Sequence, residues 1–169
     1  MANIGFISLG CAKNQVDCER MMYRVQEAGH TVCPDVVGCD VVVINTCGFI
    51  ESAQAEAIDH ILSTAGLKAD GYVGKILVTG CLSQRYQEEI MKEMPEVDGI
   101  LGTGSYTEIV PAIEALLKGN TVADFGSIDA PEQETGRILT TPEHYAYIKI
   151  AEGCDNRCSY CIIPYLRGK

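Results

Sequence analysis

Short apolar runs alternate with longer amphipathic stretches through most of the chain. The short runs are rich in β-branched residues and predict buried strands at residues 3–9, 31–33, 41–45, 75–79 and 99–101. The longer stretches between them predict helices that begin near Asn14, Phe49, Gln84 and Ser105. Strands and helices that take turns at this spacing indicate an α/β fold, a doubly wound open parallel sheet with helices on both faces.

Polar residues at the starts of these helices support their placement. Asn14 and Ser83 are candidate N-caps, the second for a helix over residues 84–94. Residues 105–108 read Ser-Tyr-Thr-Glu, a capping-box sequence for a helix that runs to Lys118. We therefore expect the helices to begin close to these residues.

The pattern changes after residue 126, where polar and turn-forming residues become frequent. We expect a first domain over residues 1–126, a linker over 127–142 and the start of a second domain over 143–169. A new strand is predicted from Tyr145 to Ile150, because apolar residues alternate there. The residues that follow are too few to complete a second domain, so we expect only its beginning, in truncated form.

Composition and charge restrict the class of protein. No apolar run approaches the ~20 residues that span a bilayer, and the first residues lack the basic and apolar segments of a secretory signal. We therefore expect a cytoplasmic protein without membrane contact. The formal net charge of −10 repels a phosphate backbone, so we expect no direct nucleic-acid binding by this region. An acidic surface suits a basic protein partner, although many acidic proteins have none.

The chain contains nine cysteines, an odd number, and lacks an export signal, which speaks against a disulfide framework. Two interpretations remain. Free cysteines are often small buried apolar residues, or they take part in metal or redox chemistry. Their positions along the chain distinguish the two.

One cysteine set lies in a single polar loop. Cys154, Cys158 and Cys161 follow a C-x3-C-x2-C pattern, which can hold three corners of a cubane iron–sulfur cluster and leaves the fourth iron open. Zinc is the alternative, but it needs a fourth ligand, and the nearby His144 precedes a strand that carries it away. Structural burial fits less well, because the residues between the cysteines are polar.

A second set consists of cysteines that each follow a predicted strand directly, namely Cys11, Cys47 and Cys81. Ligands bind outside the carboxyl ends of the strands in open parallel sheets, so these three could converge on one point. Chance placement is the alternative. Cys18, Cys33 and Cys39 lie within a helix or beside apolar residues, and for these we expect burial.

The spacing of Cys154, Cys158 and Cys161, with the aromatic Tyr160 before the last cysteine, resembles the radical S-adenosylmethionine superfamily. The resemblance implies a [4Fe-4S] cluster that binds S-adenosylmethionine through its open iron and yields a 5′-deoxyadenosyl radical on reduction. It also implies that Tyr160 lies near the adenine; simple packing of this ring is the alternative.

Both cysteine sets together resemble the methylthiotransferase family, whose amino-terminal domain carries three cluster cysteines ahead of a radical S-adenosylmethionine barrel. The segments at residues 9–14, 45–50, 78–85 and 151–155 resemble the branch that modifies a ribosomal protein. Cys18 departs from the serine expected in that pattern. The resemblance covers nearly the whole chain.

The resemblance implies methylthiolation of the β-carbon of an aspartate in a small-subunit ribosomal protein. Two [4Fe-4S] clusters and S-adenosylmethionine are implied as cofactors, and a flavodoxin or ferredoxin as electron donor. Cys154, Cys158 and Cys161 would hold the radical-generating cluster. Cys11, Cys47 and Cys81 would hold an auxiliary cluster that carries the inserted sulfur.

Two alternatives to this function remain open. The chain could belong to an enzyme that methylthiolates a tRNA adenosine, or the isolated region could be a non-catalytic iron–sulfur binding module. We expect no turnover by the 169-residue region alone, because most of the implied barrel is absent from it.

Overall fold

A computed structural model describes residues 1–130 and 134–169. Its centre is a six-stranded sheet in the order β2-β1-β3-β4-β5-β6, in which every pair is parallel. The strands are β1 (Asn3–Ser8), β2 (Thr31–Cys33), β3 (Cys39–Thr46), β4 (Val73–Gly80), β5 (Gly99–Leu101) and β6 (Val122–Asp124). The strand order changes direction between β1 and β3, which is where open α/β sheets bind ligands.

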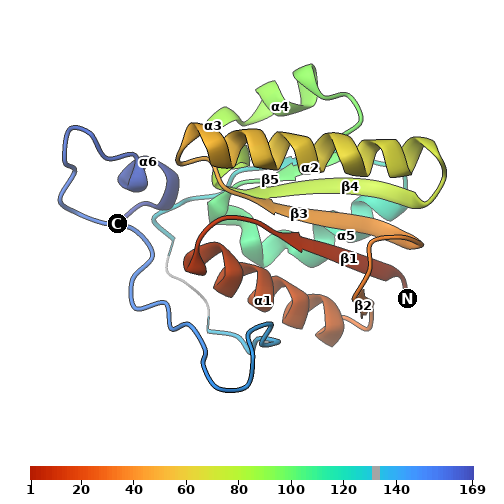
Figure 1. Ribbon diagram of the computed structural model, residues 1–169, viewed down its shortest axis with the longest axis horizontal. Coiled ribbons are helices and arrows are strands. Elements are labelled where there is room, and N and C mark those ends of the chain that lie inside the picture. Colours follow the sequence, from red (N-terminus) through yellow and green to blue (C-terminus); the bar gives the residue numbers. More distant parts are fainter. Residues whose placement is uncertain (131–133) are drawn as a thin grey trace.

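Helices cover both faces of the sheet (Figure 1). One face carries α2 (Glu51–Ala69), α3 (Cys81–Tyr86) and α4 (Glu88–Glu93), and the other carries α1 (Ala12–Glu27) and α5 (Ile109–Leu117). A 3-10 turn, η1 (Thr103–Glu108), precedes α5, and a short helix, α6 (Ile163–Arg167), lies near the end of the chain. The predicted α/β fold class is confirmed.

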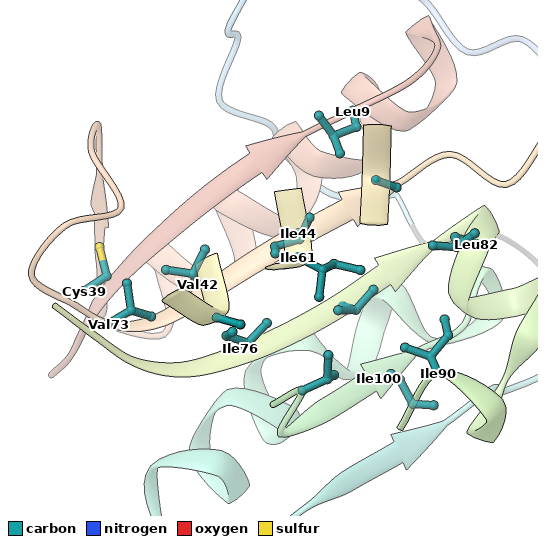
Figure 2. Packing of buried hydrophobic residues seen from close by; sticks show 14 residues of the cluster. Leu9, Cys39, Val42, Ile44, Ile61, Val73, Ile76, Leu82, Ile90 and Ile100 are labelled. Atoms are coloured by element: carbon teal, nitrogen blue, oxygen red, sulfur yellow. The ribbon is translucent and has the colours of Figure 1, made fainter. Parts of the chain in front are cut away.

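Burial on both faces of β3 explains why its sequence is a continuous apolar run. Val42 and Ile44 pack with Ile61 of α2, as Figure 2 shows, while Val41 and Val43 belong to the core on the opposite face. All five side chains are fully buried. Burial of each such side chain contributes about 1.5–3 kcal/mol, so the centre of the sheet is a rigid base for the loops at its edge.

The first helix begins earlier than predicted, and Asn14 is not its cap. Cys11 is the N-cap residue of α1, and Asn14 lies fully buried inside the first turn. Its Nδ2 donates to the carbonyl oxygens of Leu9, at 3.0 Å, and Thr46, at 2.9 Å. The side chain therefore joins the ends of β1 and β3 instead of capping its own helix.

The two later helices also differ from the prediction. The helix expected over 84–94 is divided at Gln87, whose φ of 47° ends α3 before α4 begins. The Ser83 hydroxyl donates to Gly80 O at 2.8 Å and so does not cap a helix. The Ser105 hydroxyl bonds the Asp124 carboxylate at 2.9 Å instead of completing a capping box. That contact fastens η1 to β6, a strand the sequence pattern did not predict.

Residues 145–150, predicted as a strand, do not form one in the structure. Ile148 and Ile150 are 81% and 94% exposed. A strand needs a hydrogen-bonding neighbour, and within residues 1–130 and 134–169 none lies beside this segment. The apolar alternation is therefore present without the pairing that would make it a strand.

The segment between the sheet and the cysteine loop runs over α1. The backbone of Ile138 donates to Glu19 O at 3.1 Å, and the Thr140 N–H donates to the Glu19 carboxylate at 2.8 Å. Residues 131–133 of the predicted linker lie outside the described part of the chain. None of the helices in the described residues is long and apolar enough to cross a membrane.

Candidate metal centre

Cys11, Cys47 and Cys81 lie together at the carboxyl edge of the sheet. Cys11 precedes α1, Cys47 directly follows β3, and Cys81 is the first residue of α3, after β4. The three strands are neighbours and end level, since Ser8 pairs with Asn45 and Thr46 with Gly80. Adjacent parallel strands that end level deliver their following residues to one place, and this place is the switch point between β1 and β3.

Two glycines let the cysteine loops approach one another closely. Gly10 has a φ of +94°, and a Cβ there would lie 2.7 Å from the Cys47 Cβ and 3.3 Å from its Sγ. A Cβ on Gly48 would lie 2.7 Å from the Cys81 carbonyl oxygen. Any other residue at these positions would force the loops apart. Each of these glycines directly adjoins a candidate ligand in the sequence, a signal that was not recognised there.

The thiols influence one another electrostatically. Burial raises the pKa of the Cys81 thiol above its usual value, and the Arg167 guanidinium partly opposes this rise. The Cys47 and Cys11 thiols raise the pKa of Cys81 further. The three thiols are therefore near enough to influence one another at this edge of the sheet.

The site is closed on one side and open on the other. Cys81 is buried, Cys47 is half-buried and Cys11 is exposed. An open hollow of about 810 Å³ adjoins Cys11 and Cys47, and its wall includes the exposed side chains of Phe49 and Ile50. A molecule from solution can therefore reach the site from the Cys11 side but not from the Cys81 side.

Asn14 lies behind the thiols and holds the site together. Its Oδ1 accepts hydrogen bonds from Arg167 and, at 3.8 Å, from the Cys81 thiol. Its carbonyl oxygen accepts a bond of 2.7 Å from the Asn45 side chain at the end of β3. Sequence reasoning assigned Asn14 only to a helix cap, because its burial depends on contacts far along the chain.

Arg167 lies at the site although its sequence position did not indicate this, and its side chain is buried, with only 2% exposed. Its Nε donates to the Cys81 Sγ at 3.3 Å, and Nη1 donates to Glu152 Oε1 at 2.7 Å and also to Asp17. A further bond runs from Nη2 to Asn14. Although burial disfavours the charged form, the acidic groups around it raise the pKa of the Arg167 guanidinium above its ordinary value. The arginine is therefore fully charged next to a candidate ligand.

Lys149 completes the charge balance of this cluster. It donates to Asp17 Oδ1 at 2.6 Å and also to Glu152. Burial raises the pKa of Glu152, but Arg167 and Lys149 outweigh it and leave this pKa below the ordinary value. Two cations thus face two carboxylates. Nothing in the sequence pattern pointed to this cluster, because its members come from distant segments.

The second cysteine set lies on a loop closed at its base. The backbone N–H groups of Gly153 and Cys154 donate to the carbonyl oxygens of Lys169, at 3.1 Å, and Gly168, at 3.0 Å. Within the loop, Cys161 N–H donates to Cys158 O at 3.0 Å. Tyr160, on the same loop, is 90% exposed, so it does not pack in the protein interior.

The chemistry of the donors suits a cluster. Within the described residues, no three His, Cys, Asp or Glu side chains are close enough to hold one metal ion. In a cubane each cysteine thiolate binds its own iron, whereas a structural zinc ion takes four ligands at one metal. Thiolates are the ligands of iron–sulfur clusters, and Cys11, Cys47 and Cys81 would supply three of them where Gly10 and Gly48 let the loops approach closely.

The other three cysteines outside the two sets lie in the hydrophobic core or against it. Cys18 and Cys39 are buried, and burial raises the pKa of each thiol to about 12. Cys33 is half-buried and packs against the core beside β1. The predicted burial is confirmed for Cys18 and Cys39 and holds in part for Cys33.

Comparisons with known proteins identify relatives of the whole chain. Residues 3–102 match the model described as "Uncharacterized protein family UPF0004". All of the chain aligns with a "Ribosomal protein uS12 methylthiotransferase RimO" of Thermoanaerobacter sp. (strain X514), with 48% identity. Proteins of the same name from Caldanaerobacter subterraneus subsp. tengcongensis and Clostridioides difficile are 50% and 46% identical. The chain spans 39%, 39% and 38% of these relatives' length.

Proposed function

Because the chain belongs to family UPF0004 and resembles RimO proteins over its whole length, we propose that it is the amino-terminal part of a methylthiotransferase that modifies a ribosomal protein. The observation that carries the proposal is the meeting of Cys11, Cys47 and Cys81 at one edge of the sheet. The name of the relatives gives uS12, a ribosomal protein, as their substrate.

In this proposal, Cys11, Cys47 and Cys81 hold an auxiliary [4Fe-4S] cluster, and Cys154, Cys158 and Cys161 hold a second one that binds S-adenosylmethionine. The bound cofactors supply a radical that can attack an unactivated C–H bond, together with the sulfur to be inserted. The substrate position is the β-carbon of an aspartate. Tyr160 is exposed beside Cys161 and is proposed to contact the adenine.

The protein's own residues enclose the auxiliary site on one side and leave it open to the substrate on the other. Arg167 and Asn14 close the buried side of the auxiliary site, so a substrate peptide approaches along the hollow beside Cys11 and Cys47. The net charge of −10 favours a basic partner, which suits a ribosomal protein. The proposal places the enzyme in the cytoplasm, with flavodoxin or ferredoxin as electron donor.

The domain division stays part of the proposal, with the sheet domain over 1–126, a linker over 127–142 and the start of the radical domain over 143–169. Arg167 bonds Asp17 and Thr140 bonds Glu19, and these contacts would join the proposed parts.

Iron and sulfide analysis of the anaerobically reconstituted chain tests the two sites. We expect about eight irons per chain, and about four after alanine replacement of either cysteine triad. Cys33→Ala is the matched control and should retain about eight. Loss of iron from only one of the two triple variants contradicts the two-cluster assignment.

The substrate is tested on the product. Deletion of the gene should remove an added methylthio mass from the aspartate-bearing peptide of ribosomal protein uS12. The adenosine nucleosides of tRNA should stay unchanged. An unchanged peptide together with an altered nucleoside would favour the tRNA-modifying alternative and contradict the proposed substrate.

A further inference from the structure

Arg167 stands out because it combines burial, full charge and contact with sulfur. It lies at the end of α6, six positions after Cys161, and it reaches back across the molecule to Cys81, 86 positions earlier. Figure 1 shows the carboxy-terminal segment with α6 beside the edge of the sheet where the strands end. One side chain thus connects the loop of the second cysteine set to a ligand of the first.

The donors of Arg167 are divided between two tasks. Nη1 and Nη2 bond Asp17, Glu152 and Asn14, and these bonds fix the plane of the guanidinium. Nε then points at the Cys81 Sγ, 3.3 Å away, within the range of an N–H···S bond. A planar fork held at its far end is a rigid donor, in contrast to a lysine ammonium, which rotates freely.

The base of the second cysteine loop is fastened to the same place. Lys13 Nζ donates to the carbonyl oxygens of Ala151, at 2.8 Å, and Glu152, at 2.6 Å. The Gly153 and Cys154 N–H groups bond the backbone directly after Arg167. Consequently, the orientation of Arg167 and the position of the loop base depend on each other.

We propose that Arg167 is a positioning residue that donates a hydrogen bond to the Cys81 thiolate and thereby sets the reduction potential of the auxiliary cluster. This inference rests on the proposed function. Reduction adds negative charge to a cluster, and a charged N–H donor on a ligand sulfur stabilises that extra charge. The arginine therefore makes the auxiliary cluster easier to reduce, and it does so only while the loop base is docked on α1.

The test uses the chain with Cys154, Cys158 and Cys161 replaced by alanine, so that only the auxiliary cluster remains. Its midpoint potential is measured by anaerobic titration followed by EPR. Arg167→Met should lower the equilibrium constant for reduction by about tenfold or more, a shift of about 59 mV to more negative potential. Arg167→Lys, which keeps the charge but lacks the rigid Nε, should shift the potential in the same direction by less.

Lys68→Met is the matched control, because it also removes one positive charge, whereas its bonds reach the Asp98 carboxylate and the Glu96 carbonyl oxygen at the opposite end of the sheet. Its shift should be much smaller than that of Arg167→Met. Equal shifts in these two variants, or a wild-type potential in Arg167→Lys, would overturn the hydrogen-bond role.

A second measurement needs no folded Arg167→Met variant. With ¹⁵N-labelled arginine, pulsed EPR of the reduced cluster should show a nitrogen coupling that disappears in Arg167→Lys. If the chain in which only Cys154, Cys158 and Cys161 are replaced shows no nitrogen coupling, the inference is overturned. If the chain without the second triad binds about four irons but shows no coupling, and if Arg167→Met leaves its potential unchanged, this inference alone is overturned. Absence of iron from the background variant overturns the proposed function and the inference with it.

Discussion

Charged groups gather at both ends of the sheet, and the two clusters are built differently. At the amino end of β5, the Asp98 carboxylate accepts bonds from Lys68, at 2.5 Å, Lys75, at 2.9 Å, and the Ile76 N–H, at 2.9 Å. All of these partners lie within 30 positions of Asp98 along the chain. The Asp98 side chain is 13% exposed and its lysines more so, so water reaches this cluster.

The cluster around Arg167 joins segments that are far apart in sequence. Arg167 and Asp17 are 150 positions apart, and both side chains are almost completely buried. Moreover, Arg167 donates to a candidate metal ligand, Cys81, whereas the Asp98 carboxylate accepts its bonds from two lysines and a backbone N–H. The amino-end cluster therefore joins neighbouring parts of the sheet, whereas the carboxyl-end cluster links distant segments to the candidate site.

The largest difference is expected when the central charge of the carboxyl-end cluster is removed. Arg167→Ala leaves the buried carboxylates of Asp17 and Glu152 short of a partner, and breaking a buried ion pair in this way costs about 3–5 kcal/mol. Urea unfolding of the metal-free chain measures the loss. A cost below about 1 kcal/mol would mean that this cluster is no more important to stability than a surface pair.

Gly10→Ala should have the next largest effect, because it combines an unfavourable backbone angle with a collision against Cys47. The φ is +94° and the new Cβ would lie 2.7 Å from the Cys47 Cβ. We therefore expect the free energy of unfolding to fall by about 2–3 kcal/mol. We also expect the chain to lose the iron bound by Cys11, Cys47 and Cys81.

The control for this prediction is Gly29→Ala. Gly29 has a similar φ of +84°, but no heavy atom lies within 4 Å of a Cβ placed there. It should cost about 1 kcal/mol and leave the iron content unchanged. If both variants retain full iron, the close approach of Gly10 to Cys47 is not needed by the site.

Asp98→Asn should cost about 1 kcal/mol, less than either change at the carboxyl edge, because its lysines are partly exposed and screened by water. Iron content should not change. Urea unfolding and iron analysis together check this prediction, and a loss of iron would show that the amino-end cluster is not independent of the site.

The smallest effect concerns acid stability. Burial raises the pKa of Asp98, but the bonds from Lys68 and Lys75 outweigh it, so its folded pKa lies below the ordinary 3.8. The stabilisation is therefore complete above the unfolded pKa and is lost as pH falls from it through the folded pKa. The free energy of unfolding, measured from pH 5 down to pH 2.5, should show a smaller acid-dependent decrease in Asp98→Asn than in the unaltered chain. Parallel curves would contradict the ion pairing of Asp98.

Much of the fold follows from the sequence because it depends on local pattern. The apolar runs predicted five of the strands, and β3 was recognisable because it is buried on both faces. The short edge strand β6 was missed, since its pairing with β5 is a contact between segments. Helix starts were misjudged wherever a polar side chain bonds a distant group, as Asn14 does with Thr46.

At the candidate site, too, features that depend on local pattern were predicted, whereas contacts between distant segments were not. The places of Cys11, Cys47 and Cys81 directly after predicted parallel strands made their convergence predictable from the order of elements. In contrast, Arg167 gave no signal, because its partners are separated from it by up to 153 positions and only folding brings them together. The predicted strand over 145–150 failed for a related reason, since alternation cannot supply a neighbouring strand.

We propose that Cys11, Cys47 and Cys81, from three separate loops, form a cluster site that is independent of the second triad. The most direct measurement is the iron and sulfide content of the reconstituted chain with Cys154, Cys158 and Cys161 replaced by alanine, read together with its Mössbauer spectrum. We expect about four irons and four sulfides per chain, with the spectrum of a single [4Fe-4S] cluster. A chain without iron, or one that binds a single zinc ion at these cysteines, would contradict it.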